Sequence, residues 1–497
     1  MVKSDLIIIG SGPGGYRSAC YAAAHGLTVT IFESAQAGGT CLNCGCIPTK
    51  SLCRNAEILD TLRDADTFGL DSLSFSLNFD KIMERKNSVV AQLRGGVEAL
   101  MKSPGITFVQ KKATLTAAHT VVTDDEEYAA DNIIIATGSR AKIPPINGTQ
   151  LPGVITSTEM LEVKTAPKRL CIVGAGVIGM EFASAFSSFG SEVTVVEFMK
   201  EALPTLDSDI AKRLRQTISK RGVTFHMQAA VKEIEEKTGE NGERTLNVII
   251  EKKSKPLNVE ADTVLIATGR AANTEGIGLE EAGVEFDRKG IHTDDNFATN
   301  VPGIYAIGDV NGKCMLAHAA TFQGLHVVNH ILGLTDNIRP DIMPSAIFTN
   351  PEAASVGLSE DRCKELGLEY KCKKGFFRAN GKALAMNETD GMVKLISDSD
   401  DKIIGCHIFG AHASDMVQEI AALMNAGATT RQLADIIHIH PTLSETLCDM
   451  CLGCPATVIT STNGRICLSP DTFFFHTLFI IPTPDTHYYR LPSSHSQ

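Results

Sequence analysis

Two cysteines, Cys41 and Cys46, stand five residues apart in the segment GGTCLNCGCIPTK, which spans residues 38–50. On a regular helix a rise of about 1.5 Å per residue separates such positions by roughly 7.5 Å along the axis, too far for an unstrained disulfide. A helix that carries both thiols must therefore be distorted locally if they are to bond. Gly45 and Pro48 are residue types that tolerate or impose such a distortion.

A glycine-rich turn, GSGPGG, occupies residues 10–15. In this pattern Gly10 permits a tight turn, Gly12 lets the backbone approach a pyrophosphate, and Gly15 allows close packing of the following helix. The N-terminus of that helix faces the anion. Glu33, eighteen residues past Gly15, is placed to accept hydrogen bonds from a ribose diol. Such turns also close ordinary strands, so one copy alone is weak evidence.

A second copy of the turn, GAGVIG, carries Gly174, Gly176 and Gly179, and Glu197 takes the corresponding acidic place. Two copies in the same context predict two bound dinucleotides. An acid at this place repels a ribose phosphate and binds a free hydroxyl, whereas NADP sites commonly present arginine. We therefore expect NAD at the second site.

The elements that position these residues repeat along the chain. Residues 5–33 and 169–197 each indicate a buried strand, a glycine turn, a helix and a second strand. Apolar strands at 131–137 and 262–269 follow the two units, and 303–309 forms a further strand. The predicted class is α/β, with two Rossmann-like dinucleotide-binding domains and a C-terminal α+β domain. The expected boundaries are 1–143 and 272–342 for the first nucleotide-binding domain, 144–271 for the second, 343–455 for the α+β domain, and 456–497 for an atypical tail with little periodicity.

Composition narrows the class of protein. The 497 residues are 43% hydrophobic and carry a net charge of -12, without the clustered Lys and Arg that neutralise nucleic-acid phosphates. The apolar run at 473–481 is far shorter than the roughly 20 residues that a membrane span requires. The first residues leave no room for a signal peptide, so we expect a cytoplasmic protein without nucleic-acid or membrane partners. The 14 cysteines are scattered, and we expect most of them to be reduced.

The segment 38–50 resembles the GGTCLNxGCIPxK redox-disulfide motif of a flavoprotein family that includes glutathione reductase, mercuric reductase and dihydrolipoamide dehydrogenase. The resemblance spans roughly residues 4–450. Glu197 argues against the NADPH-linked reductases, and the segments GPGGY (12–16) and CIPTK (46–50) are most similar to the dihydrolipoamide dehydrogenase branch. The resemblance implies FAD at the first dinucleotide site and NAD at the second.

By this resemblance Cys41 and Cys46 form the redox disulfide. Cys41 would exchange with the dihydrolipoyl thiolate, and Cys46 would lie beside the flavin and resolve the mixed disulfide. Electrons would then pass to FAD and, as hydride, to NAD. Lys50 would lie near the isoalloxazine ring and pair with Glu181 on the helix after the second glycine turn.

Residues 438–445, HIHPTLSE, are similar to the family motif HxHPTxxE. A lone histidine is more often structural, but in the family the second histidine is the base and the glutamate orients it. This implies His440 as base and Glu445 as its partner. Because the C-terminal domain builds the family's dimer interface, His440 would serve the cysteines of the opposite subunit of a homodimer. A base is needed because a thiol with a pKa of roughly 8.5 attacks only as thiolate.

The resemblance also implies further contacts and partners. Asp309 matches the acid that binds the FAD ribityl chain, and Ala317 lies at the start of the helix beneath the flavin. Lipoyl domains and the acyltransferase core of 2-oxo acid dehydrogenase complexes, or the lipoyl protein of glycine cleavage, would be the partners. The remaining cofactor contacts implied are Ala113 and Gly138 for FAD, and Val231 and Gly269 for NAD.

Several alternatives stay open. Cys44 departs from the motif because it adds a third thiol. It is either a bystander thiol or a source of disulfide scrambling on oxidation. The CxxCxxC spacing of Cys448, Cys451 and Cys454 is similar to iron-sulfur ligation, although no metal is our expectation. The competing functions are another FAD/NAD(P)H disulfide reductase, an NADH oxidase, or a non-catalytic subunit of an assembly. The tail is expected to be disordered, or to form a packed flap.

Overall fold

The first sheet is mainly parallel and carries the first glycine turn. The computed structural model describes residues 1–238 and 244–452, which belong to one compact unit. The strands of this sheet are β1 Val2–Ile9, β2 Val29–Phe32, β3 Ile106–Val109, β4 Thr114–Ala117, β5 Thr120–Val122, β6 Glu127–Ile135 and β19 Ile304–Ala306. Their order is β3-β2-β1-β6-β5-β4, with β19 also paired to β6.

Alternation along β1 fills two core clusters. Leu6 and Ile8 point into a cluster that includes residues of helices α1 and α8, and Ile7 and Ile9 point into a cluster on the other face. The elements around this sheet are α1 Pro13–Ala24, α8 Ala317–Ile331, η2 Gly308–Asn311, β17 Phe286–Asp287 and β18 Gly290–Ile291. Because the last four residues of β1 are buried on both faces of the sheet, they form a continuous apolar run, 6–9.

The second sheet repeats this plan with five parallel strands in the order β11-β10-β9-β15-β8. Its elements are β8 Val154–Thr156, α5 Ser157–Met160, β9 Arg169–Val173, α6 Val177–Ser188, β10 Glu192–Glu197, α7 Ser208–Lys220, β11 Thr224–Met227 and β15 Thr263–Ile266. An antiparallel sheet beside it consists of β12 Ala229–Thr238, β13 Arg244–Lys252 and β14 Lys255–Ala261. The two predicted strand-helix-strand units are confirmed.

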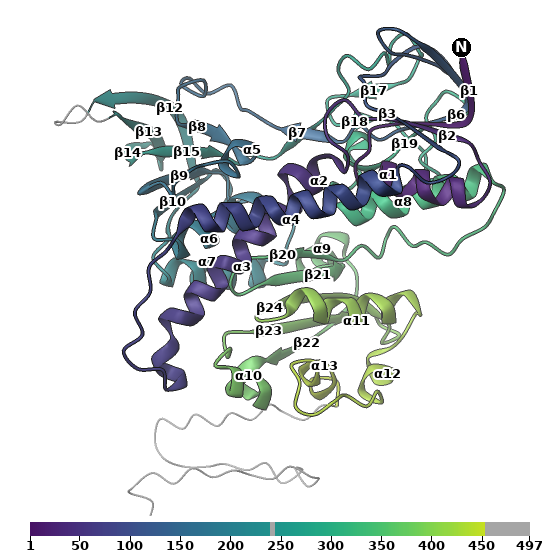
Figure 1. The fold of residues 1–497 in the computed structure, drawn as a ribbon. Coiled ribbons are helices and arrows are strands. Elements are labelled where there is room, and N and C mark those ends of the chain that lie inside the picture. The colour runs from purple at the N-terminus through teal and green to yellow at the C-terminus, as the bar shows by residue number, and fades with distance from the viewer. Residues whose placement is uncertain (239–243, 453–497) are drawn as a thin grey trace, which may run out of the picture. The chain divides into compact units, whose positions relative to one another are not determined.

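A two-stranded ribbon joins the two parallel sheets (Figure 1). Its strands, β7 Ser139–Ala141 and β16 Arg270–Ala272, pair antiparallel. Each follows directly on a strand of a parallel sheet, β6 or β15, through a glycine with positive φ, 71° at Gly138 and 115° at Gly269. The two similar segments at 131–137 and 262–269 therefore lead into a pair of strands that connects the two nucleotide-binding units.

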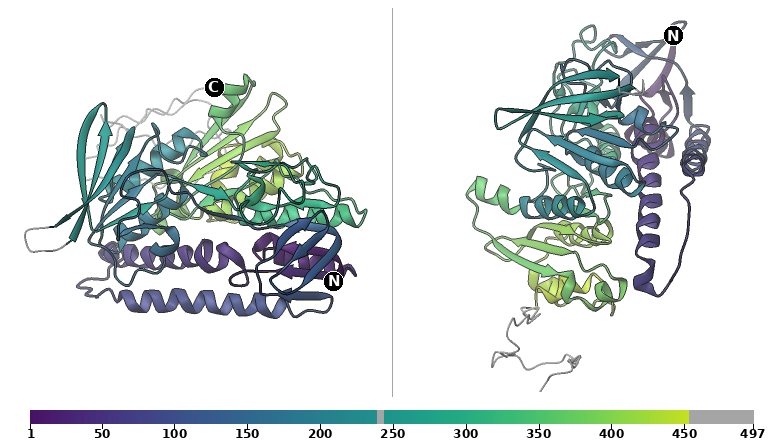
Figure 2. Two further views of the ribbon diagram at one scale, coloured as in Figure 1. Left: turned by 90° about the horizontal axis from the view of Figure 1, so that it is seen from above. Right: turned by 90° about the vertical axis from the view of Figure 1, so that its left-hand side faces the viewer.

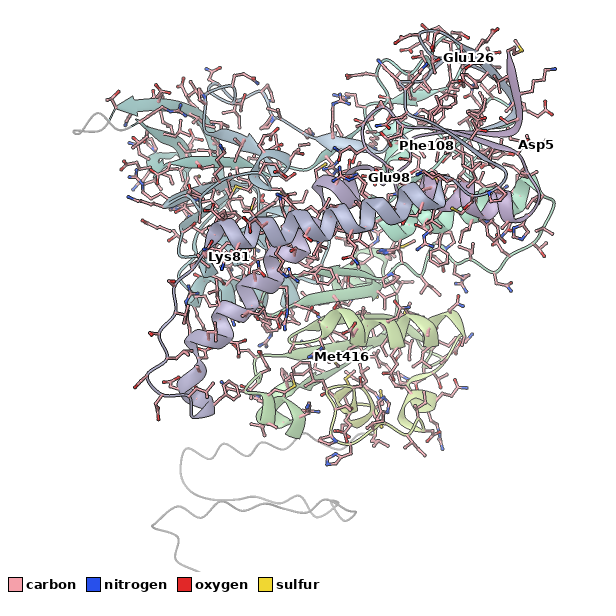
Figure 3. The ribbon with its side chains drawn as sticks, viewed as in Figure 1. Asp5, Lys81, Glu98, Phe108, Glu126 and Met416 are labelled. Atoms are coloured by element: carbon pink, nitrogen blue, oxygen red, sulfur yellow. The ribbon has the colours of Figure 1, made fainter. Side chains whose placement is uncertain are left out.

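The C-terminal part is an antiparallel sheet with helices, as predicted. Its strands, β20 Ser345–Ile347, β21 Ala353–Gly357, β22 Lys371–Phe376, β23 Met392–Ser397 and β24 Ile403–Phe409, lie in the order β20-β21-β24-β23-β22. Its helices are α9 Glu360–Leu366, η3 Phe377–Ala379, α10 Gly381–Met386, α11 Ala413–Asn425, α12 Thr430–Ala434 and α13 Glu445–Asp449. Helix α11 covers the sheet and buries Met416 (Figure 3).

A long helical pair connects these parts. The elements are α2 Gly39–Cys44, α3 Cys46–Arg63, η1 Ala65–Phe68 and α4 Phe79–Leu100. Helix α3 packs on α6 and on α4, which lies beside it on the outside of the molecule (Figure 2). One apolar cluster runs from α3 through the second sheet to Met392 and Phe409 of the C-terminal sheet. The core is therefore continuous across the expected boundary at residue 342.

No helix of residues 1–238 and 244–452 has the length and apolar run that a membrane crossing requires. The predicted tail at 456–497 and Cys454 lie outside the described residues.

Candidate active site

The two glycine turns have the same geometry. Gly10 and Gly174 have φ of 106° and 108°, which favours glycine. A Cβ on Gly15 would lie 1.9 Å from the Gly10 carbonyl oxygen, and one on Gly179 would lie 2.0 Å from that of Gly174. The third glycine of each motif lies in the first turn of its helix, α1 or α6, and lets that helix touch the glycine turn, which is the role predicted for it.

The two acids also occupy equivalent positions. Glu33 accepts hydrogen bonds from the Ser11 backbone N–H at 3.0 Å and from the Ser11 hydroxyl at 2.8 Å. Glu197 accepts from the backbone N–H groups of Ala175 and Met199, each at 2.7 Å. Each carboxylate closes its own glycine turn, and each lines the cavity described next.

A cavity of about 1510 Å³ joins the two turns. This volume exceeds the roughly 300–1,000 Å³ of a pocket for one small molecule, and so suits two extended ligands. Gly15 and Gly179 are not among its lining residues, because each is buried in the first turn of its helix, against the carbonyl of the first glycine of the motif. The predicted cofactor residues that line it are Gly10, Gly12, Glu33, Lys50, Ala113, Gly138, Gly174, Gly176, Glu197, Val231, Gly269, Asp309 and Ala317.

The cysteine segment is bent as the spacing requires. Helix α2 ends at Cys44 and α3 begins at Cys46, with Gly45 between them at φ -143° and ψ -111°. A Cβ on Gly45 would lie 2.9 Å from the Thr40 carbonyl oxygen, so a side chain would hold the two helices apart. The break brings Cys41 and Cys46 into hydrogen-bond contact. Cys46 also gains the first turn of α3, where the helix dipole favours an anion.

Cys41 and Cys46 are both free thiols in the structure, and their pKa values differ. The hydrogen bond from Cys41 lowers the pKa of Cys46 to about 7; burial opposes this effect, and the Lys50 ammonium adds to it. The same contact, together with burial, raises the pKa of Cys41. In the reduced pair the thiolate is therefore held on Cys46, the thiol at the start of α3.

Lys50 is held by an ion pair with Glu181 across 131 positions of sequence. Its Nζ lies 2.9 Å from both carboxylate oxygens, and Glu181 is only 3% exposed. Glu181 also accepts from the Phe348 backbone N–H at 3.0 Å, and the Lys50 ammonium stands 4.8 Å from the centroid of the Phe348 ring. Burial alone would lower the pKa of Lys50, but Glu181 raises it. Lys50 thus stays a cation beside Cys46.

Cys44 lines the same cavity at the end of α2. Burial raises its pKa, and its thiol is hydrogen-bonded to Thr158 of α5 and to Thr40. A thiol of raised pKa is a poor nucleophile, because the thiolate is the reactive form. These contacts favour the bystander interpretation over disulfide scrambling.

His440 and Glu445 pair at the far end of the C-terminal domain. The Nδ1 of His440 lies 2.8 Å from Glu445 Oε1, and the second oxygen accepts from the Thr442 backbone N–H at 2.8 Å. The His440 side chain is 81% exposed, and neither residue of the pair is among those that line the cavity. Ile437 and Ile439 beside it are 97% and 78% exposed. Within the described residues, one chain does not bring this base to the cysteines.

The chain matches two family models. Residues 4–324 match the pyridine nucleotide-disulphide oxidoreductase family, and residues 343–451 match the dimerisation domain of that family. The chain belongs to the pyridine nucleotide-disulphide oxidoreductases. It is therefore an enzyme of a flavoprotein class that uses FAD and NAD, in agreement with the two dinucleotides that the glycine turns predict and with the FAD that the resemblance implies. Its second matched region is a dimerisation domain, which fits a homodimer.

Curated relatives and solved structures support this family assignment. The chain is 41% identical over 448 residues to the dihydrolipoyl dehydrogenase of Chlamydia muridarum, covering 89% of this chain and 94% of the relative. It is 38% identical over 467 residues to a dihydrolipoyl dehydrogenase of Bacillus subtilis, covering 90% and 97%. The Cu(II) complex of the HOCl-induced flavoprotein disulfide reductase RclA from Escherichia coli is similar with a TM-score of 0.80 and 30% identity, covering 91% and 100%.

The residues of this oxidoreductase fit both cofactors. Cβ atoms built on Gly12 and Gly176 meet nothing within 4 Å, so the backbone is open to the cavity where a pyrophosphate would approach. Glu33 directly follows β2 and Glu197 is the last residue of β10, at the places where a ribose diol would bind. We propose that FAD binds at the first turn, beside the cysteines, and that NAD binds at the second.

Sequence reasoning missed some residues of this cavity. Arg270 donates to the Ser139 hydroxyl and to the Ser139 carbonyl, both at 2.6 Å, and lies 3.8 Å from Asp309. The Ser139 hydroxyl in turn hydrogen-bonds Asp309. Ser139 and Arg270 each directly follow an Ala-Thr-Gly segment, at residues 136–138 and 267–269, and this repeat was the available signal. The Ser11 hydroxyl bond to Glu33 could also have been found, since Ser11 lies within the first motif.

The iron-sulfur alternative gains no support from the described residues. Within them no group of three or more His, Cys, Asp or Glu could hold a metal ion, and Cys448 and Cys451 are free thiols. Cys454, the third member of that spacing, lies outside the described residues.

Proposed function

We propose that this oxidoreductase oxidises protein-bound dihydrolipoyl groups to lipoyl groups and reduces NAD to NADH. The observation that carries the proposal is one cavity that holds both nucleotide turns, the Cys41–Cys46 pair and the Lys50–Glu181 ion pair. The similarity to dihydrolipoyl dehydrogenases over about nine-tenths of the chain supports the choice of substrate.

The cysteines carry out the exchange. A dihydrolipoyl thiolate attacks Cys41 of the disulfide, which forms a mixed disulfide and releases Cys46 as a thiolate. The second dihydrolipoyl thiol, and not Cys46 as the resemblance suggested, then attacks the lipoyl sulfur of the mixed disulfide, because attack by Cys46 would only reverse the first step. This closes the lipoyl ring and leaves Cys41 as a thiol. The release of Cys46 is favoured because the Lys50 ammonium lowers the pKa of this thiol, and a thiol of low pKa is a good leaving group. A bound FAD would supply the redox chemistry by which the two electrons of the thiol pair reach NAD as a hydride.

Lys50 and Glu181 stabilise the negative charge of the Cys46 thiolate. The Lys50 ammonium lowers the pKa of Cys46, and Glu181 keeps Lys50 protonated and in place. We assign Asp309, with Ser139 and Arg270, to the FAD ribityl side of the cavity. We assign Ala113, Gly138 and Ala317 to the remaining FAD contacts, and Val231 and Gly269 to NAD.

His440 of a second copy serves as the base in this proposal. Its imidazole is exposed, and Glu445 holds Nδ1, which leaves Nε2 free to take a proton from the dihydrolipoyl thiol. The neighbouring exposed isoleucines mark the same face as one that another chain would cover. Each active site then takes its cysteines from one chain and its base from the other.

The partners and domain boundaries belong to the same proposal. Lipoyl domains of a 2-oxo acid dehydrogenase complex, with its acyltransferase core, or the lipoyl protein of glycine cleavage would deliver the substrate. The division at 1–143, 144–271, 272–342 and 343–455 follows the change from one sheet to the next, although the apolar core crosses the last of these boundaries.

The experiment is a substrate panel on the purified, FAD-loaded protein. NADH formation from dihydrolipoamide and NAD is the expected activity, with much less activity when NADP replaces NAD. The relative RclA is named a flavoprotein disulfide reductase, so reduction of other disulfides by NADH or NADPH is measured in parallel. Turnover of another disulfide that exceeds turnover of dihydrolipoamide would replace the lipoyl assignment. Oxygen consumption independent of Cys41 would instead indicate an NADH oxidase.

A further inference from the structure

One segment of the second nucleotide unit, residues 198–207, lines the cavity through Phe198, Met199, Pro204 and Thr205. It follows directly on Glu197, so it covers the part of the cavity that we assign to NAD. We refer to residues 198–207 as the NAD loop.

The NAD loop is held in a strained conformation. Leu203 has φ of 52°, which is unfavourable for a side chain of its kind, and it is only 1% exposed. Its backbone N–H donates to the Ala175 carbonyl of the second glycine turn at 2.9 Å. Strained backbone persists only where its surroundings fix it from several sides. The loop therefore needs firm anchors at both ends.

Glu197 anchors one end, and Asp207 anchors the other. Asp207 is fully buried and caps helix α7, because its carboxylate accepts from the Asp209 backbone N–H at 3.1 Å. The Nζ of Lys394 lies 2.8 Å and 2.9 Å from the two Asp207 oxygens. Lys394 belongs to β23 of the C-terminal domain and is itself 1% exposed.

Lys394 is the centre of a larger cluster of charges. Its ammonium also lies 2.6 Å from Glu360 and 3.2 Å from Asp209. The hydrogen bond from Lys394 is the main reason that the pKa of Glu360 falls to about 2. Removal of Lys394 is costly chiefly at Asp207, because this fully buried carboxylate would lose its ammonium partner in a medium that solvates ions poorly, whereas Glu360 keeps Lys364 and Asp209 keeps Lys374. The cluster joins the dimerisation domain to the start of α7.

We propose that Lys394 is a positioning residue for NAD: through Asp207 it fixes the NAD loop against the second glycine turn. The proposal rests on the assignment of NAD to that turn. The dimerisation domain would then contribute in two separate ways: it would supply the base His440, and it would affect the affinity for NAD through Lys394. Lys394 touches neither the thiols nor the lipoyl substrate in this scheme.

The test compares three variants with the FAD-loaded wild-type protein. Lys394→Met removes the cation with little loss of volume. Asp207→Asn weakens the pair but keeps a residue that caps helices well. Lys371→Met is the matched control, because Lys371 lies in β22, is 59% exposed and pairs with Asp401 of its own domain. NAD affinity is measured by calorimetric titration of the oxidised protein, alongside KM values for NAD and dihydrolipoamide.

We expect Lys394→Met to weaken NAD binding and raise the KM for NAD by about 3- to 30-fold, the range for a residue that acts through a packed network. The KM for dihydrolipoamide and the single-turnover reduction of the flavin by dihydrolipoamide should stay within about twofold. Asp207→Asn should show the same split, and the double variant should fall short of the product of the two effects. Lys371→Met should behave as wild type.

Unchanged NAD affinity in a folded Lys394→Met protein, or equal loss for both substrates, would overturn the proposal. If Lys394→Met does not fold, Asp207→Asn decides, and a lower melting temperature with unchanged NAD affinity counts against the proposal. Recovery of NAD affinity in Lys394→Arg supports it. If the lipoyl assignment is wrong instead, dihydrolipoamide would not reduce the flavin of the wild-type protein, although NAD would still bind. This result is distinguishable from a failure of the Lys394 proposal.

Discussion

Alanine replacements at Gly12 and Gly15 separate the two uses of glycine in the first turn. A Cβ on Gly15 would stand 1.9 Å from the Gly10 carbonyl oxygen, whereas ordinary contact begins at 3.4 Å. The helix and the turn must therefore separate by about 1.5 Å, and both atoms belong to stiff backbone. Overpacking of this kind costs about 1–3 kcal/mol, and we place Gly15→Ala at the upper end, about 3 kcal/mol.

Gly12→Ala should behave in the opposite way. Gly12 has φ of -65° and ψ of -177°, which alanine adopts without strain, and its Cβ position meets nothing within 4 Å. The added methyl group instead occupies the space where a pyrophosphate would approach the backbone. The FAD-free protein should thus keep its stability but lose FAD affinity by more than about tenfold, the effect of about 1.4 kcal/mol.

The assay is thermal unfolding of FAD-free protein, followed by measurement of the flavin retained after gel filtration. A loss of about 3 kcal/mol corresponds to a fall of roughly 6–12 °C in melting temperature for a domain of this size. We expect that fall in Gly15→Ala and a change within about 1 °C in Gly12→Ala. Equal destabilisation by both variants, or full FAD retention by Gly12→Ala, would refute the assignment of roles.

Four further predictions test single contacts. Lys50→Met should raise the pKa of Cys46 above about 7, measured by thiolate absorbance of the reduced protein against pH. Glu197→Ala should narrow the preference for NAD over NADP in steady-state KM values. Cys44→Ser should leave dihydrolipoamide turnover within about twofold. The lowered pKa of Glu360, about 2 against an ordinary 4.5, adds stability that is complete above pH 4.5 and lost as the pH falls through 2, so denaturant unfolding of Glu360→Gln should differ less from wild type at pH 3 than at pH 7.

Local patterns predicted the two nucleotide-binding units well. Each turn places its glycines, strand and acid within about 30 residues, so the geometry depends on short-range packing that the sequence shows directly. The spacing of Cys41 and Cys46 also predicted a local distortion of the helix if the two thiols bond, and named Gly45 and Pro48 as residues that allow one; the structure places the break at Gly45.

Contacts between distant segments were harder to predict. The pairing of Lys50 with Glu181 spans 131 positions and came only from family resemblance. The pairing of Lys394 with Asp207 spans 187 positions, and nothing in the sequence around either residue marks it. A lysine in a strand and an aspartate before a helix are ordinary surface residues until two domains bury them together.

The most direct test of the two-chain active site is subunit complementation. Cys41→Ser and His440→Gln proteins are each expected to lose nearly all NADH formation from dihydrolipoamide. Unfolded together and refolded with FAD, they should form mixed dimers that each contain one intact site, made of the cysteines of one chain and the His440 of the other. Random pairing then predicts recovery of about a quarter of wild-type activity. Absence of recovery in confirmed mixed dimers, or full activity of His440→Gln alone, would contradict the account.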